Sequence, residues 1–284
     1  MTGLMTTQDP AVLRRRLCRH LVQFRGERTQ REVAEALDWS PSKLLRIENG
    51  AIGIASTDLR ALLAFYGVAS PALVEMMVHM AKESRHSVAS PYADVLSPEM
   101  VVYLRFEASA STMRQYHPYL VPGLLQTEEY ARAVIDSFAD PQTPAEVRER
   151  QLEARLARQG VLDRARTHFI LDESALRRRV DDDGTTMRGQ LSHIVDLNRR
   201  ANVTIQVLPF GAGLCRGAQW PFVLLDFPDA DDDTLLYQEG RDTRVTRDDP
   251  AEVARHEAAF AELSSAAIPD GELPAVIASL LADR

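Results

Sequence analysis

The segment that most constrains the fold is residues 29–50, TQREVAEALDWSPSKLLRIENG, because it carries start and stop signals for two short helices. Thr29, followed three residues later by Glu32, has the pattern of a capping box, which begins the first helix. Ser40 is a favourable N-cap residue, and Pro41 loses no backbone hydrogen bond at the first position of the second helix. The segment ends on Asn-Gly, and both residue types tolerate the left-handed conformation of a helix end. The sequence therefore predicts two helices joined by a tight turn.

The second helix of this segment has distinct inner and outer faces. Leu44 and Ile47 lie three residues apart and are expected to face inward, which leaves Ser42, Lys43 and Arg46 outside. Small polar and cationic side chains on a short exposed helix suit the major groove of DNA, where arginine and lysine bind guanine and serine binds several bases. We therefore expect DNA contacts from six residues of this segment: Gln30, Ser40, Ser42, Lys43, Arg46 and Asn49.

The segment resembles the Xre-type, phage-repressor-like helix-turn-helix. The residues that match the pattern of that family are Gln30, Ala34, Ser40, Ser42, Ile47, Glu48 and Gly50. The resemblance implies a five-helix domain that binds operator DNA. Apolar periodicity predicts the other helices at residues 11–25, from a Ser56 or Thr57 cap to residue 66, and at 70–85, where a stripe of Met76, Met77 and Met80 is expected to face the core. We therefore assign residues 1–88 to this domain, with residues 1–9 as a loose tail.

Two further expectations concern how this domain meets DNA. The first predicted helix carries four arginines on its expected solvent side, and these are candidates for phosphate contacts: Arg14, Arg15, Arg16 and Arg19. One short recognition helix reads too few bases to find a site by itself. We therefore expect a homodimer on an inverted repeat, in which the two recognition helices enter successive major grooves.

The charge of the chain is divided unequally between its two parts. The 284 residues carry a net charge of −8, which at first argues against a nucleic-acid partner. Residues 1–88 contain 12 Lys and Arg against 9 Asp and Glu, a net charge of +3, whereas the remainder contains 21 against 32, a net charge of −11. The mildly basic part fits DNA. The acidic remainder must bind a partner, self-associate or sense a signal.

The composition excludes several other classes of protein. No apolar run approaches the roughly 20 residues of a membrane helix, and the N-terminus lacks an apolar signal-peptide core, so we expect a cytoplasmic protein. Cys18 and Cys215 are the two cysteines, which is too few for a disulfide framework or a cysteine zinc site. We predict no metal and no cofactor, and we interpret the aspartate runs at 181–183 and 231–233 as solvated loops.

Residues 89–98 are rich in Ser, Pro and short polar residues and are predicted to form a linker, and residues 99–284 form the second domain. Helical patterns cover residues 99–112, 144–159, 174–180, 185–201, 250–264 and 274–282, and Thr127 caps another helix. Strand patterns cover residues 168–171, 203–208, 222–227 and 235–238. Residues 116–125 cannot be helical throughout, because two prolines and a glycine interrupt them. The second domain is therefore predicted to be mixed α/β, and the whole chain α+β and mainly α.

The second domain is similar to the uncharacterised domain that follows an Xre-type head in the actinobacterial WhiJ-like, antitoxin-like regulators. The resemblance is carried by VPGLLQTEEYARAV at 121–134, RERQLEARL near 150, LDESALRRRV at 171–180, QLSHIVDL at 190–197, NVTIQVLPFGAG at 202–213 and PFVLLDF at 221–227. Cys215-Arg216 departs from the pattern, which often has His and a small residue there. The resemblance implies regulation through a small partner protein, usually encoded next door.

An enzyme is not expected, because the chain lacks the nucleophile elbow, the zinc-protease helix motif, the P-loop and the dinucleotide fingerprint. The glycine-rich loop at 210–217 follows a strand but precedes no clear helix, so it makes a poor phosphate site. An alternative is a ligand-sensing regulator whose second domain binds a small molecule beside this loop. An enzyme with a DNA-binding head is a more remote alternative.

Overall fold

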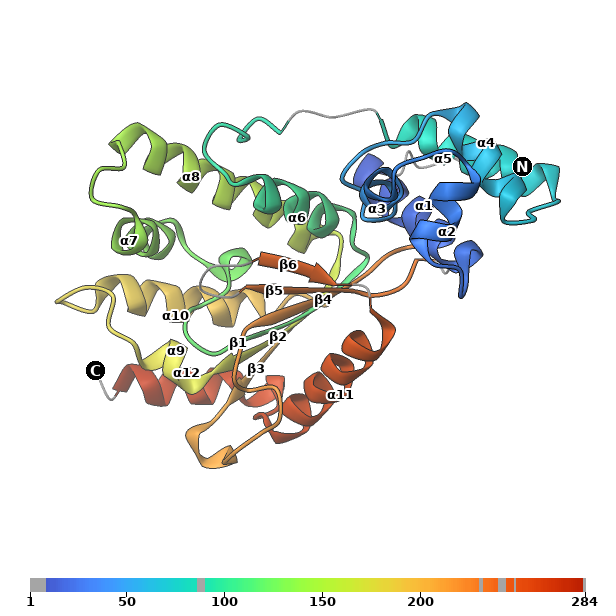
Figure 1. Ribbon diagram of the computed structural model, residues 1–284. Coiled ribbons are helices and arrows are strands. Elements are labelled where there is room, and N and C mark those ends of the chain that lie inside the picture. The colour runs from blue at the N-terminus through green and yellow to red at the C-terminus, as the bar shows by residue number, and fades with distance from the viewer. Residues whose placement is uncertain (1–8, 86–89, 230–231, 240–243, 248, 283–284) are drawn as a thin grey trace, which may run out of the picture. The chain divides into compact units, whose positions relative to one another are not determined.

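The computed structural model describes residues 9–85, 90–229, 232–239, 244–247 and 249–282. The chain divides into two compact units, residues 1–90 (unit 1) and 91–284 (unit 2). Unit 1 is helical and unit 2 combines helices with a sheet, so the predicted α+β, mainly α class is confirmed (Figure 1). Apart from Asp9, the predicted N-terminal tail lies outside the described residues.

Within residues 9–85, unit 1 has five helices: α1 (Pro10–Arg25), α2 (Gln30–Ala36), α3 (Pro41–Glu48), α4 (Ser56–Phe65) and α5 (Pro71–Glu83). Their apolar faces form one core that includes Leu17, Leu21, Leu44, Leu59 and Met77. Two details differ from the predictions. The residue before α4 is Ala55, which has no side-chain cap, so the expected Ser56 or Thr57 cap is wrong. Met76, expected in the methionine stripe of α5, is 45% exposed.

The described strands of unit 2 form one six-stranded sheet in the order β3-β2-β1-β4-β5-β6. Its strands are β1 (Thr112–His117), β2 (Arg166–Asp172), β3 (Val203–Leu208), β4 (Phe222–Asp226), β5 (Leu235–Glu239) and β6 (Arg244–Arg247). β1, β2 and β3 are parallel to one another, whereas β4, β5 and β6 continue the sheet in antiparallel pairs. β1 therefore joins a parallel half to an antiparallel half.

Helices cover both faces of this sheet (Figure 1). On one face α11 (Pro250–Ala266) packs on Tyr116, Phe222 and Leu224 through Phe260 and Leu263. The opposite face meets α6 (Pro98–Ser109), whose Tyr103 stacks on Tyr237 with ring centroids 3.9 Å apart. The remaining α-helices of unit 2 are α7 (Glu128–Phe138), α8 (Ala145–Ala157), α9 (Glu173–Arg177), α10 (Thr185–Leu197) and α12 (Leu273–Ala282).

Two strands and one connection differ from the sequence predictions. β1 and β6 were not predicted, and the helix expected to reach residue 112 ends at Ser109. Residues 91–98, assigned to the linker, belong to unit 2, where Arg150 of α8 binds Asp94 at 3.1 Å. The aspartates of the first run lie in a loop before α10, as predicted, and Asp183 accepts a hydrogen bond from the Thr185 amide. Part of the second run, Asp231, lies outside the described residues.

None of the helices in the described part of the chain is long and apolar enough to span a bilayer. No group of three or more His, Cys, Asp or Glu side chains within the described ranges is arranged to hold a metal ion.

Candidate nucleic-acid interface

The two-helix segment of unit 1 begins with the capping box. The Thr29 amide donates to Glu32 Oε2 at 2.7 Å, and the Glu32 amide donates back to Thr29 Oγ1 at 3.2 Å. These hydrogen bonds from Thr29 lower the pKa of the Glu32 carboxyl below its usual value. α2 therefore starts at the position that the sequence predicts, with its first backbone donors satisfied.

The turn between α2 and α3 is tight and fixed by backbone contacts. Asp38 has a φ of 55°, a left-handed conformation that aspartate tolerates better than most residues. The next amide, that of Trp39, donates to the carbonyl of Ala34 at 2.8 Å. Ser40 then caps α3 by accepting from the Lys43 amide at 3.2 Å. The angle between the two helices is thus set by local hydrogen bonds.

A buried carboxylate ties the helices of this segment together. Glu48 has a side chain that is only 2% exposed, and it accepts from Arg25 Nε at 2.8 Å and from Gln30 Nε2 at 2.6 Å. Burial raises the pKa of Tyr66 to about 12, and the nearby Glu48 charge adds to that increase. The carboxylate therefore joins α1, α2 and α3, and the Gln30 amide, expected on DNA, is engaged inside the protein.

α3 presents a continuous exposed face. Leu44 and Ile47 are buried as predicted, and the exposed positions after Pro41 are Ser42, Leu45, Arg46 and Asn49. These four follow the i, i+3, i+4, i+7 spacing of one helix face. Leu45, which is 43% exposed, was not predicted as a contact, although its spacing from Ser42 and Asn49 places it on this face. An apolar side chain there suits the methyl group of thymine.

Lys43 was predicted on the outer face of α3, but its side chain contacts other residues of unit 1. Its ammonium lies 2.8 Å from Asp58 Oδ2 of α4 and 4.0 Å from the centre of the Trp39 ring. Its charge is therefore partly neutralised within unit 1. Arg46 is exposed, and its guanidinium has no partner in the described part of the chain. Of the two predicted cationic contacts, Arg46 is thus better placed to reach a base.

The other predicted contacts lie around this face. Ser40 and Ser42 are exposed, with their hydroxyl oxygens 3.1 Å apart at the start of α3, and Asn49 is exposed at its end. The four arginines of α1, which were predicted on its solvent side, are half-buried. Arg14, for example, donates to the carbonyl of Ser84 at 2.9 Å. Gln30 and Lys43 have partners inside unit 1, whereas Ser42, Arg46 and Asn49 share its exposed helix face.

Two family models match the chain. One, described as "Helix-turn-helix domain", matches residues 13–77, and the other, described as "Domain of unknown function (DUF5753)", matches residues 101–278. No curated protein and no solved structure matches the chain. Unit 1 is therefore the helix-turn-helix DNA-binding domain of a regulator, and the second model covers most of unit 2.

Proposed function

The chain belongs to the family defined by the domain of unknown function DUF5753, and because a helix-turn-helix domain precedes that domain, we propose a sequence-specific transcription regulator of the Xre-type, WhiJ-like and antitoxin-like class. The observation that carries the proposal is the exposed face of α3, on which Ser42, Arg46 and Asn49 lie around Leu45. The proposal assigns DNA binding to unit 1 and regulation to unit 2. It assigns no reaction to the chain.

In the proposed complex α3 enters the major groove. Arg46 pairs with the O6 and N7 atoms of a guanine, Asn49 with the N6 and N7 atoms of an adenine, and Leu45 packs on a thymine methyl group. Ser40 and the Ser42 amide at the start of α3 contact a phosphate. The support for these roles is the chemistry of each exposed side chain together with the Glu48 network, which holds α3 before DNA arrives.

The operator is best found by selection. The full chain is incubated with random duplex DNA, and the bound duplexes are recovered and sequenced through several rounds. A single enriched motif supports the proposal. Retention of DNA without enrichment of any motif would reduce unit 1 to a non-specific binder, because phosphate contacts hold DNA but carry no sequence information.

We further propose that the protein binds as a homodimer to an inverted repeat. The enriched motif is then expected to contain two half-sites about 10 base pairs apart, or a multiple of that spacing, because two-fold symmetric recognition helices enter successive major grooves. Light scattering on the free chain and on its complex measures the number of copies. One copy on a single half-site would contradict the dimer and leave the recognition helix intact.

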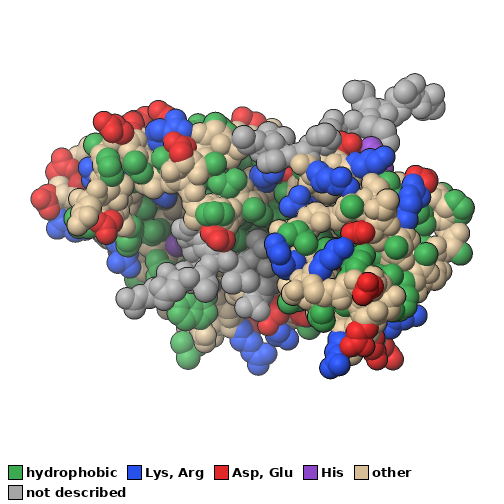
Figure 2. Space-filling view, turned by 45° about the horizontal axis from the view of Figure 1, so that its top comes forward, with side chains coloured by type: hydrophobic (Ala, Val, Ile, Leu, Met, Phe, Trp, Pro, Cys, Tyr) green, Lys and Arg blue, Asp and Glu red, His purple; other side chains and the backbone are tan. Residues whose placement is uncertain are grey.

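Unit 2 is proposed to receive a small partner protein, encoded nearby, with a basic surface. The support is its charge, which is −11 for residues 89–284, and Asp and Glu side chains gather at the left end of the view in Figure 2. Unit 1 needs its cationic face for DNA, so unit 2 offers the complementary surface. Co-purification from the native cell followed by mass spectrometry identifies the partner.

The identified partner should associate more slowly as salt rises. Raising the salt concentration from about 0.05 M to about 0.5 M shortens the screening length to a few ångströms, and the association rate is expected to fall roughly ten-fold. Pull-downs with residues 1–88 and 89–284 locate the site. Retention by residues 1–88 alone would refute the assignment to unit 2, and an association rate that ignores salt would refute its electrostatic basis.

A further inference from the structure

Unit 2 contains a pocket that the DNA-binding function does not use. Its volume is about 970 Å³, at the upper end of the range of roughly 300–1,000 Å³ that is typical of small-molecule sites. The pocket lies on the sheet face that carries Gln115, Val223 and Tyr237, under α6, α7 and α8. Ala212 and Cys215 of the glycine-rich loop pack with the core on the opposite face. The sequence suggested a ligand site beside that loop. This pocket instead lies on the other face of the sheet.

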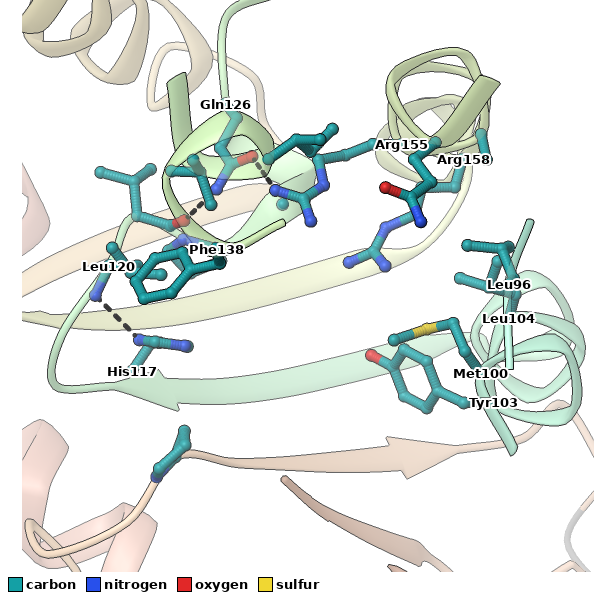
Figure 3. Close-up of a pocket in the computed structure, with 18 of the residues that line it drawn as sticks. Leu96, Met100, Tyr103, Leu104, His117, Leu120, Gln126, Phe138, Arg155 and Arg158 are labelled. Atoms are coloured by element: carbon teal, nitrogen blue, oxygen red, sulfur yellow. Dashed lines mark hydrogen bonds between the residues drawn. The ribbon is translucent and has the colours of Figure 1, made fainter. Parts of the chain in front are cut away.

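Two walls of the pocket are apolar. Leu96, Met100 and Leu104 line it from α6 and the residue pair before that helix, and Val134, Ile135 and Phe138 line it from α7. Figure 3 shows Met100 and Leu104 on one side of the space and Phe138 toward the other. Phe138 is 74% exposed, so a large aromatic ring stands in water at this site. Contact with an apolar molecule would remove that surface from water.

The third wall is cationic although unit 2 is acidic. Arg155 of α8 and Arg158 just after it extend into the space (Figure 3), and Arg178 also lines it, whereas Asp140 is the single acidic residue among those lining the pocket in the described chain. Arg155 Nη1 donates to Gln126 Oε1 at 3.1 Å, and Arg158 Nε lies 3.4 Å from Glu107 Oε1. Both guanidinium groups are thus positioned by the protein itself.

Two polar side chains of β1 face the same space. Gln115 lines the pocket and is only 8% exposed. Its amide offers both a donor and an acceptor to a ligand in this space. His117 accepts through Nδ1 from the amides of Tyr119 and Leu120, at 3.3 and 3.1 Å, so the neutral ring carries its proton on Nε2. The polar part of the pocket is therefore rich in hydrogen-bond donors.

We propose that this pocket binds a small amphipathic organic acid. The guanidinium groups of Arg155 and Arg158 take its anionic head, the Gln115 amide and the His117 ring supply further hydrogen bonds, and the α6 and α7 walls cover its apolar body. This ligand class follows from the presence of both cationic and apolar walls. An inorganic anion would leave the apolar walls without a contact, and a neutral apolar molecule would leave the hydrogen-bond donors unpaired. The inference concerns unit 2 alone and stands independently of operator binding.

The test uses decanoate and decanol, which share a chain length and differ in charge at the head. Trp220 lines the pocket, so the full chain with Trp39→Phe reports binding through a single tryptophan. Decanoate is expected to bind at one saturable site at least about ten-fold more tightly than decanol, because hydrogen bonds to a charged head are the stronger ones. Equal affinities, or no binding of either compound, would overturn the proposal.

Three variants locate the head group. Arg155→Gln keeps an amide next to Gln126 and Gln115→Leu keeps the volume, and each is expected to weaken decanoate about ten-fold while decanol binding stays unchanged. Arg148→Gln is the control, because Arg148 lies on α8 next to Asp136 and does not line this pocket. Circular dichroism checks that each variant is folded. Decanoate affinity that survives both pocket variants, or falls equally in the control, would refute the assigned site.

Discussion

Replacing Arg46 with alanine is expected to weaken binding to the selected operator by about 1–3 kcal/mol, the usual contribution of an arginine that reads a guanine. Arg46 is exposed at the centre of the α3 face, and its loss removes two hydrogen bonds to a base edge. Preference for guanine at one position of each half-site should relax at the same time. Mobility shifts on the operator and on single-base variants measure both effects.

Two further variants show whether the loss of affinity in Arg46→Ala comes from a lost contact with a base. Lys43→Ala should also weaken binding, but by less and more evenly across sequences, because the Lys43 ammonium must first leave Asp58 and the Trp39 ring. Arg31→Ala is the matched control: Arg31 is an exposed arginine of α2 that pairs with Glu35. If neither Arg46→Ala nor Lys43→Ala changes affinity, α3 is not the recognition helix.

Replacing Arg25 with alanine is expected to destabilise unit 1 by about 3–5 kcal/mol, because it leaves the buried Glu48 carboxylate without its cation. The Gln30 amide alone cannot balance that charge. Urea unfolding, followed by Trp39 fluorescence in a Trp220→Phe background, measures the free energy of unfolding of unit 1. The Arg31–Glu35 pair is exposed, so Arg31→Ala should cost no more than about 1 kcal/mol.

A second substitution separates the charge from the packing. Glu48→Leu combined with Arg25→Met removes both partners and is expected to recover most of the lost stability, because no buried charge remains unpaired. If Arg25→Ala costs no more than Arg31→Ala, then the Glu48 carboxylate does not depend on Arg25. If the double variant is as unstable as Arg25→Ala, the loss is one of packing.

The helix-turn-helix could be predicted from sequence because its signals are local. The capping box, the Ser40 cap and the inward Leu44 and Ile47 are all set by residues within one or two turns of each other, and the structure has each of them. The role of Lys43 could not be predicted in the same way. It depends on Asp58, which lies fifteen residues further along the chain on α4.

β1 was missed for the opposite reason. Its sequence, TMRQYH, contains no Val, Ile, Leu or Phe, and half of its six residues are Arg, Gln or His, although it is a central strand. Arg114 is tolerated there because it donates to Asp226 at 3.1 Å and to Glu257 at 3.0 Å. Both partners are more than a hundred residues away in sequence, so no local pattern reveals them. Gln115 and His117 of the same strand line the pocket with residues that are distant in sequence, so no local pattern reveals them either.

The place of β1 in the sheet also sets the order in which the chain can fold as it leaves the ribosome. Its parallel neighbour β2 is complete by Asp172, but its antiparallel neighbour β4 ends at Asp226. Until then one edge of β1 is open, and open edges are where growing chains aggregate. Arg114 belongs to this strand while its edge is open. A charged side chain on an edge strand opposes aggregation in folded proteins, and Arg114 can do the same during synthesis. The helix-turn-helix is finished long before, so a nascent chain carries a complete DNA-binding unit while unit 2 is still being made.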